Sequence, residues 1–198
     1  MYRNMDATLP RATVPARKKN KLHAKEFLLW GFMVSVFMIF AGLTSAVIVR
    51  RADGNWLEYV LPSAFWWSTA LVLLSSISLQ WSVGRARRDE LRQLKIGLIL
   101  TLVMGLLFLL SQWMAFRQMV DVGLYVVGNP STSFLYVITG LHALHMLSAV
   151  VVLFVIFARV FQYKVHSKNM LSIRLGTLYW HFLGLLWIYL YVFFQLVF

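Results

Sequence analysis

Five long runs of apolar residues, separated by short polar segments, dominate the pattern of this chain. They cover approximately residues 27–49, 63–83, 96–116, 133–158 and 175–198. Each run holds about 20 residues or more, enough for a helix to cross the roughly 30 Å of hydrocarbon in a bilayer. A helix also satisfies its own backbone hydrogen bonds, as lipid requires. The pattern predicts an all-α, polytopic membrane protein built as a bundle of five transmembrane helices.

Charged residues lie almost wholly outside these runs. The segment 1–26 is basic and polar and contains two prolines, so we expect a flexible tail. If successive runs cross the membrane, 16 of the 19 Lys and Arg residues fall on the side of this tail. The positive-inside rule then places the N-terminus in the cytoplasm and the C-terminus outside. The first run is too long for a signal-peptide core, so no secretory signal is expected.

Composition narrows the chemistry that the chain can carry. It is 60% hydrophobic and only 13% charged, far from an ordinary soluble domain. The absence of cysteine excludes disulfides and thiolate metal sites. The net charge of +12 is accounted for by the tail and loops, so no nucleic-acid partner is expected.

Small and hydroxyl residues recur at helical spacing within two of the runs, which indicates close packing between membrane helices. The two sets are Ser68, Ser75 and Ser82, and Gly97, Thr101 and Gly105. No carboxylate lies at the middle of a run, and no pair of broken segments marks a transporter repeat. Autonomous ion transport is therefore only weakly supported.

Three histidines lie within the apolar runs and raise the main chemical question. His142 and His145 are three residues apart, so a helix places them on one face, and His181 lies in the last run. Three explanations are open: a metal or haem site, a proton path, or hydrogen bonds between helices. Three histidines without cysteine or a nearby acid fall short of a structural zinc site. The spacing alone favours hydrogen bonds between helices, and leaves a metal or haem site and a proton relay as alternatives.

Two ordered segments resemble a known family. "NPSTSFLYVITGLHALHM" (129–146) contains a T-G-x-H-x-x-H motif, and "YWHFLGLLWIYLYVFF" (179–194) opens with Y-W-H-F. Both resemble subunit III of the haem-copper cytochrome c oxidases, and "LPSAFWWSTALVLLSSISLQ" (61–80) and "MGLLFLLSQW" (104–113) agree in order. The likeness runs from about residue 30 to 198. Short bacterial members of this family have five helices, as expected here.

The resemblance implies a non-catalytic integral membrane subunit of an aerobic respiratory complex in the bacterial inner membrane. Such a subunit has no active site and no cofactor or metal of its own. It packs against catalytic subunit I, which holds haem and copper, with subunit II in the same complex, and it binds phospholipid and supports stable turnover. The positions that match the family motifs are Thr139, Gly140, His142, His145, Tyr179, Trp180, His181, Phe182 and Trp187. We expect them to serve contacts between helices or a lipid cleft.

Three positions depart from the family pattern, in each case by the loss of a carboxylate. Val36 stands where many relatives carry a glutamate in the first helix of this type. The family's Gln-x-x-Glu pair reads Gln112 followed by Ala115, so the glutamate is lost, and Gly184 replaces an aspartate after the Y-W-H-F motif. A carboxylate-based proton role is therefore not carried over. The alternative function is a free-standing membrane haem protein or small transporter that uses the three histidines.

Overall fold

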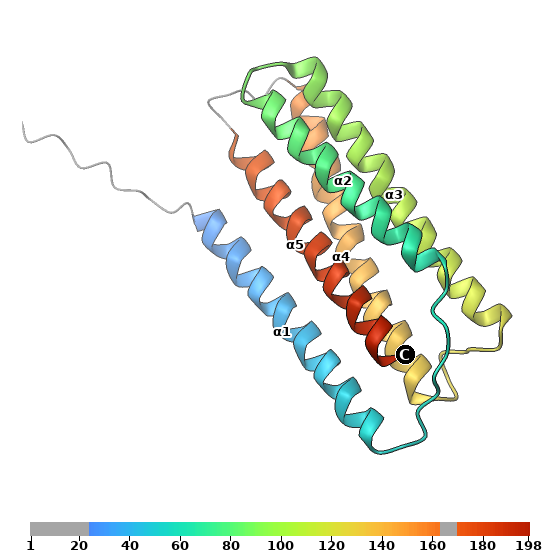
Figure 1. Ribbon diagram of the computed structural model, residues 1–198. Coiled ribbons are helices and arrows are strands. Elements are labelled where there is room, and N and C mark those ends of the chain that lie inside the picture. Colours follow the sequence, from blue (N-terminus) through green and yellow to red (C-terminus); the bar gives the residue numbers. More distant parts are fainter. Residues whose placement is uncertain (1–23, 163–169) are drawn as a thin grey trace, which may run out of the picture.

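The computed structural model describes residues 24–162 and 170–198, and it arranges them as a bundle of helices (Figure 1). The helices are α1 (Ala24–Ala52), α2 (Ala64–Ala86), α3 (Leu91–Asp121), α4 (Pro130–Phe161) and α5 (Leu171–Val197). The described residues contain no strand. The prediction of an all-helical fold is confirmed, and every helix extends past at least one end of its predicted apolar run.

Four of the described helices, α1, α3, α4 and α5, are long and apolar enough to cross a membrane. Helix α2 has 23 residues and is less apolar, because it carries five serines and a glutamine among its leucines and valines. Length and hydropathy therefore support membrane spans for four of the five predicted segments. The predicted tail 1–26 overlaps α1 by its last three residues, and residues 1–23 lie outside the described part of the chain.

Two helices each contact three others: α5 contacts α1, α2 and α4, and α4 contacts α1, α3 and α5. Helices α2, α3, α4 and α5 form a closed bundle, because α3 also packs on α2 and α4. Helix α1 lies outside this bundle, against α4 and α5, and makes no contact with α2 or α3 in the described residues (Figure 1). Its inner face buries Met33, Val36, Phe40, Thr44 and Val47, while most of its other apolar side chains are exposed.

Helices α2 and α3 approach closely along the small residues that the sequence pattern singled out. The Ser82 hydroxyl donates to the Leu94 carbonyl (3.1 Å), and the Ser78 hydroxyl donates to the Gly97 carbonyl (3.2 Å). A Cβ atom on Gly97 would lie 2.7 Å from Cβ of Ser82. Only glycine therefore allows this backbone approach, which lets serine hydroxyls bond across the helix pair.

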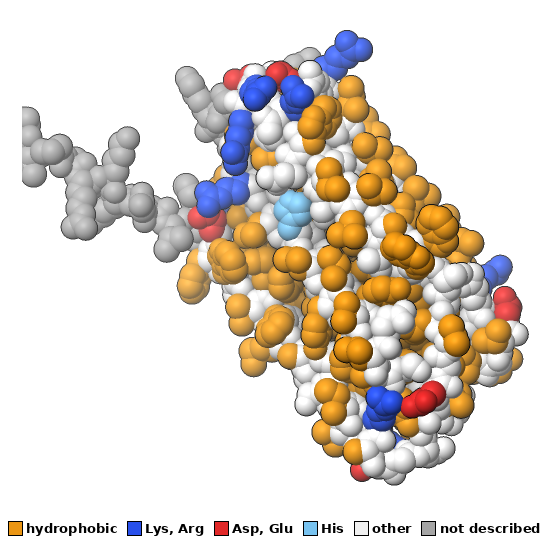
Figure 2. Space-filling view, in the orientation of Figure 1, with side chains coloured by type: hydrophobic (Ala, Val, Ile, Leu, Met, Phe, Trp, Pro, Cys, Tyr) orange, Lys and Arg blue, Asp and Glu red, His pale blue; other side chains and the backbone are white. Residues whose placement is uncertain are grey.

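The two ends of the bundle differ in charge. Figure 2 shows most of the visible Lys and Arg side chains at the end where α1 and α5 begin and α2 ends.

At the end opposite the basic one, hydrogen bonds fix the segment between α1 and α2 to the end of α5. The Trp56 indole donates to the Val197 carbonyl (3.2 Å), and the Tyr59 amide donates to the Phe198 carbonyl (3.2 Å). Burial raises the pKa of the Tyr59 phenol, so this group stays neutral.

Candidate functional site

His142 is fully buried within a cage of three aromatic rings. The rings of Phe40, Phe108 and Trp187 come from α1, α3 and α5, with centroids 6.1, 5.9 and 5.1 Å from the imidazole. Neither ring nitrogen of His142 has a hydrogen-bond partner in the described part of the chain. The expected hydrogen bond from His142 to a neighbouring helix is thus absent there. Aromatic side chains surround the imidazole instead, because α1, α3 and α5 each place one ring against this point of α4.

His145 lies one turn further along α4 and is half-buried. Its Nδ1 atom is 2.8 Å from the Leu141 carbonyl, which can only accept, so Nδ1 carries the proton. The hydrogen bond of His145 therefore stays within its own helix, in contrast to the expected contact between helices. Its ring also packs near Phe32 and Phe40 of α1, at 6.3 and 5.8 Å. The i, i+3 spacing of the two histidines does place both against α1.

The two buried tryptophans of α5 join it to α2. The Trp180 indole donates to the Ser75 hydroxyl (3.1 Å), and the Trp187 indole donates to the Thr69 hydroxyl (3.0 Å). All four side chains are buried, so these bonds form where water does not compete. Thr139 is also buried, but its hydroxyl donates to the Leu135 carbonyl of its own helix (2.6 Å).

Tyr179 and His181 occupy different surroundings on α5. The Tyr179 hydroxyl shares a hydrogen bond of 2.7 Å with the Ser148 hydroxyl of α4. His181 is half-buried, and no ring contact in the described residues joins it to His142 or His145. The structure thus brings His142 and Trp187 together and leaves His181 apart.

The three positions that lack the family's carboxylates are all buried. Val36 and Ala115 are 1% and 0% exposed, and Val36 lies on the α1 face between Phe32 and Phe40. A Cβ atom on Gly184 would lie 3.4 Å from the Ser76 hydroxyl oxygen of α2. A carboxylate at any of these points would therefore be buried inside the bundle.

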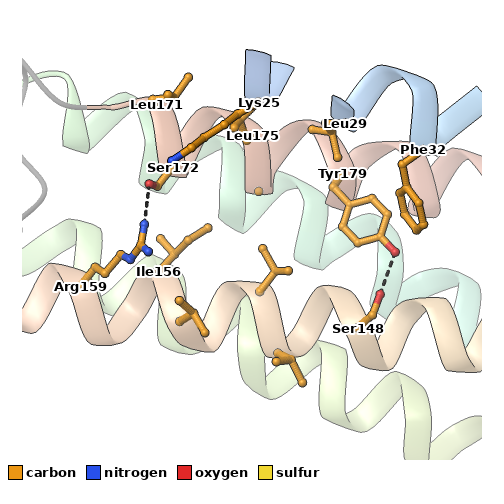
Figure 3. A pocket seen from close by; sticks show the side chains of 14 residues that line it. Lys25, Leu29, Phe32, Ser148, Ile156, Arg159, Leu171, Ser172, Leu175 and Tyr179 are labelled. Atoms are coloured by element: carbon orange, nitrogen blue, oxygen red, sulfur yellow. Dashed lines mark hydrogen bonds between the residues drawn. The ribbon is translucent and has the colours of Figure 1, made fainter. Parts of the chain in front are cut away.

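A groove of about 510 Å³ opens between α1, α4 and α5 (Figure 3). Its walls are mostly apolar, and Tyr179 and Phe32 lie at one end of it. Lys25 and Arg159 line the other end, where the Arg159 guanidinium donates to the Ser172 hydroxyl (3.0 Å). The groove therefore has apolar walls along its length and two cationic side chains at the basic end of the bundle.

Sequence reasoning did not identify two of these features. The groove depends on the offset of α1 from the closed bundle, which no local pattern encodes. A buried polar cluster between α2 and α3 was also missed: Gln112 donates to the Ser68 hydroxyl (2.8 Å), which donates to Ser111 (2.9 Å). The Ser68 repeat was its only signal. Among the described residues, no group of three His, Cys, Asp or Glu side chains is placed to hold a metal ion.

Comparison with known proteins agrees with the motif resemblance. The family model described as cytochrome c oxidase subunit III matches residues 57–197. Cytochrome c oxidase subunit 3 of Corynebacterium diphtheriae is 25% identical over 197 residues, which cover 96% of this chain and 94% of the relative. The probable cytochrome c oxidase subunit 3 of Mycobacterium leprae is 27% identical, with 81% of each chain covered.

A further relative belongs to a ubiquinol oxidase. Cytochrome bo(3) ubiquinol oxidase subunit 3 of Buchnera aphidicola is 25% identical over 180 residues, which cover 89% of this chain and 95% of the relative. The family match extends from the segment before α2 to the end of α5, and includes both tryptophan bonds and His142 with two of its three ring neighbours, Phe108 and Trp187. This chain is a multi-pass membrane protein that belongs to the cytochrome c oxidase subunit III family.

Proposed function

We propose that this subunit III serves a cytochrome c oxidase of an aerobic respiratory chain, in which it packs against catalytic subunit I beside subunit II. The observation that carries the proposal is the family match over residues 57–197. Haem and copper belong to the partner subunits in this account. The contribution of this chain is assembly, lipid binding and stable turnover of the complex that reduces O2 and moves protons.

The surroundings of the histidines favour this function over a free-standing haem protein. A haem iron needs an imidazole nitrogen that faces an open pocket. Phe40, Phe108 and Trp187 surround the His142 ring, and this side chain is fully buried. These residues do not fit a haem held between His142 and His145. They fit an aromatic core that holds α1, α3, α4 and α5 together.

The groove between α1, α4 and α5 suits one phospholipid with an anionic headgroup. Its apolar walls match acyl chains, and Lys25 and Arg159 supply positive charge at the basic end of the bundle. Basic pockets between membrane helices on the cytoplasmic side bind anionic headgroups in this way. The lipid would fill the space between α1 and the closed bundle, and so strengthen a helix that packs on only two neighbours.

We further propose that α2 is the fifth span. Its 23 residues reach about 35 Å as a helix, and it runs beside α3 in the bundle (Figure 1). Four of its five serines bond to α3 carbonyls or to its own backbone, which lowers their cost in lipid. With five spans, the basic end faces the cytoplasm and the C-terminus lies outside the bacterial inner membrane.

Removal of this chain from the assembled oxidase tests the proposal. A complex of the partner subunits alone should retain its haem absorbance and begin to reduce O2 at a comparable rate. Its activity should then decline faster during continuous turnover than that of the full complex. Complete loss of haem or of the initial rate upon removal would assign the chain a catalytic role, in conflict with the proposal.

A further inference from the structure

A second hollow lies at the end of α3 that is distant from the basic loops. Its volume is about 430 Å³, and its lining residues all belong to the last part of α3: Trp113, Phe116, Arg117, Val120 and Asp121. Phe116 is held in place by a stacked contact with Tyr136 of α4, with ring centroids 5.1 Å apart. The hollow therefore combines aromatic side chains with two charged residues, Arg117 and Asp121, which form its charged rim.

The rim carries one charge of each sign, and the two are four residues apart on one helix. Such residues lie one above the other on a helix face, about 6 Å apart along the axis. Figure 2 shows a basic and an acidic side chain near each other over this end of α3. The ion pairs found in the described residues involve neither Arg117 nor Asp121. Both charges are exposed and available to a ligand that carries both signs.

The order of side chains along α3 follows the order of groups in a membrane lipid. Trp113 lies nearest the middle of the helix, Arg117 lies one turn further out, and Asp121 is the last residue of α3. Tryptophan is favoured at the level of the lipid glycerol and headgroup. A phosphate lies outside the glycerol, and in an ethanolamine headgroup a two-carbon linker carries the ammonium group beyond it. Guanidinium binds phosphate well, and carboxylate binds ammonium.

We propose that this hollow binds a zwitterionic aminophospholipid, with the phosphate on Arg117 and the ammonium group on Asp121. The site is separate from the groove between α1, α4 and α5. That groove is lined by Lys25 and Arg159 without a carboxylate, whereas the carboxylate of Asp121 selects a headgroup that ends in a cation. The inference requires that α3 lie in a membrane, and it does not depend on which electron donor the complex uses.

Lipid retention by the intact complex tests the site. The complex is placed in nanodiscs of equal parts phosphatidylethanolamine and phosphatidylglycerol, then extracted with mild detergent, and the retained lipids are counted by mass spectrometry. Arg117→Gln should lower retained phosphatidylethanolamine at this site about tenfold, since it removes a charge-assisted hydrogen bond. Asp121→Asn should keep phosphate binding but abolish the preference for phosphatidylethanolamine.

Arg51→Gln is the matched control, because Arg51 lies at the same end of the bundle but already pairs with Glu58 at 2.9 Å. This variant should retain both lipids as the unchanged complex does. The groove is proposed to retain an anionic lipid of its own, so the number of retained phosphatidylethanolamine molecules decides the question, and an unchanged number in Arg117→Gln would overturn the proposal. So would an unaltered preference in Asp121→Asn, or a loss in Arg51→Gln as large as that in Arg117→Gln. Since Asp121→Asn is expected to change selectivity and not total retention, misfolding does not imitate the expected result.

Discussion

At the scale of single residues, His142 shows how a polar ring is accommodated in an aromatic core. Its nitrogens have no partner in the described residues, while three rings from three other helices pack around it. A phenylalanine ring, which has no nitrogens, should make the same contacts with these three aromatic side chains. The packing role and a ligand or hydrogen-bonding role therefore make different predictions for substitution.

We predict that His142→Phe leaves the yield and haem spectrum of the purified complex nearly unchanged. His142→Ala should instead leave a cavity and destabilise the subunit by about 3 kcal/mol. Thermal unfolding of the complex in detergent, compared for the two variants, measures the difference. If phenylalanine were as harmful as alanine, the imidazole nitrogens would have a function that aromatic packing does not explain.

Gly105 lies on α3 where α4 and α5 both approach. A Cβ atom there would lie 2.6 Å from Cη2 of Trp180 and 3.2 Å from a methyl group of Val150. Trp180 is fully buried, and its indole nitrogen is bonded to Ser75, so its ring has little freedom to move. The contact is steric and leaves no room for a methyl group.

Gly105→Ala should therefore destabilise the bundle by about 1–3 kcal/mol through overpacking. Gly42→Ala is the matched control, because Gly42 lies on the exposed face of α1 with no atom within 4 Å of the added Cβ. The control should be neutral or slightly stabilising, since alanine meets no clash there and favours helix more than glycine does. A Gly105→Ala subunit with the same unfolding midpoint as the control would contradict this packing.

The residue scale also shows what spacing can and cannot predict. The i, i+3 pair correctly indicated that His142 and His145 share a helix face, and both pack against Phe40 of α1. Spacing did not reveal their partners, because Phe108 and Trp187 come from other helices and meet His142 only through tertiary packing. The hydrogen bond to Leu141 is local, and competes with any bond that His145 could make across the bundle.

At the scale of elements, the hydrophobic runs predicted all five helices because α-helix is the stable form of such segments. Helix α2 is the instructive case. Its five serines lower its hydropathy, yet four of them bond within α2 or to α3, and the helix is unbroken. The lateral position of α1 was not predictable, because its apolar pattern fits either lipid or protein on every face.

The groove beside α1 leads to a prediction at this scale. Lys25→Gln together with Arg159→Gln should reduce the anionic phospholipid that the complex retains after detergent washing, since both cations of the groove are removed. Arg88→Gln is the control, because Arg88 is exposed in the turn between α2 and α3 and does not line the groove. Lipid phosphorus and headgroup analysis measures the effect. Equal lipid content in the double variant and the control would remove the groove as a lipid site.

At the scale of the whole molecule, the proposed five spans place the two ends of α2 on opposite sides of the membrane. The chain has no cysteine, so single cysteines report position without background. Val60, before α2, is 93% exposed, and Arg88, after α2, is also exposed. An impermeant maleimide added to intact cells should label Val60→Cys. It should label Arg88→Cys only after the membrane is opened.

Labelling of both positions from the same side would mean that α2 does not cross, and would leave the four spans supported by hydropathy. The reverse pattern, with Arg88→Cys labelled from outside, would contradict the orientation that the basic residues predict. The labelling experiment thus tests both whether α2 crosses the membrane and which side the basic end of the bundle faces.

The central claim is that this chain functions as a subunit III without redox centres of its own. The most direct measurement is purification of the tagged chain from its native membrane, followed by visible spectroscopy and metal analysis. The account predicts co-purification with a larger, haem-binding catalytic subunit that reduces O2. The chain expressed without that partner should show no Soret absorbance and no bound transition metal. Stoichiometric haem or copper in the isolated chain, or the absence of any haem-binding partner in the native preparation, would contradict it.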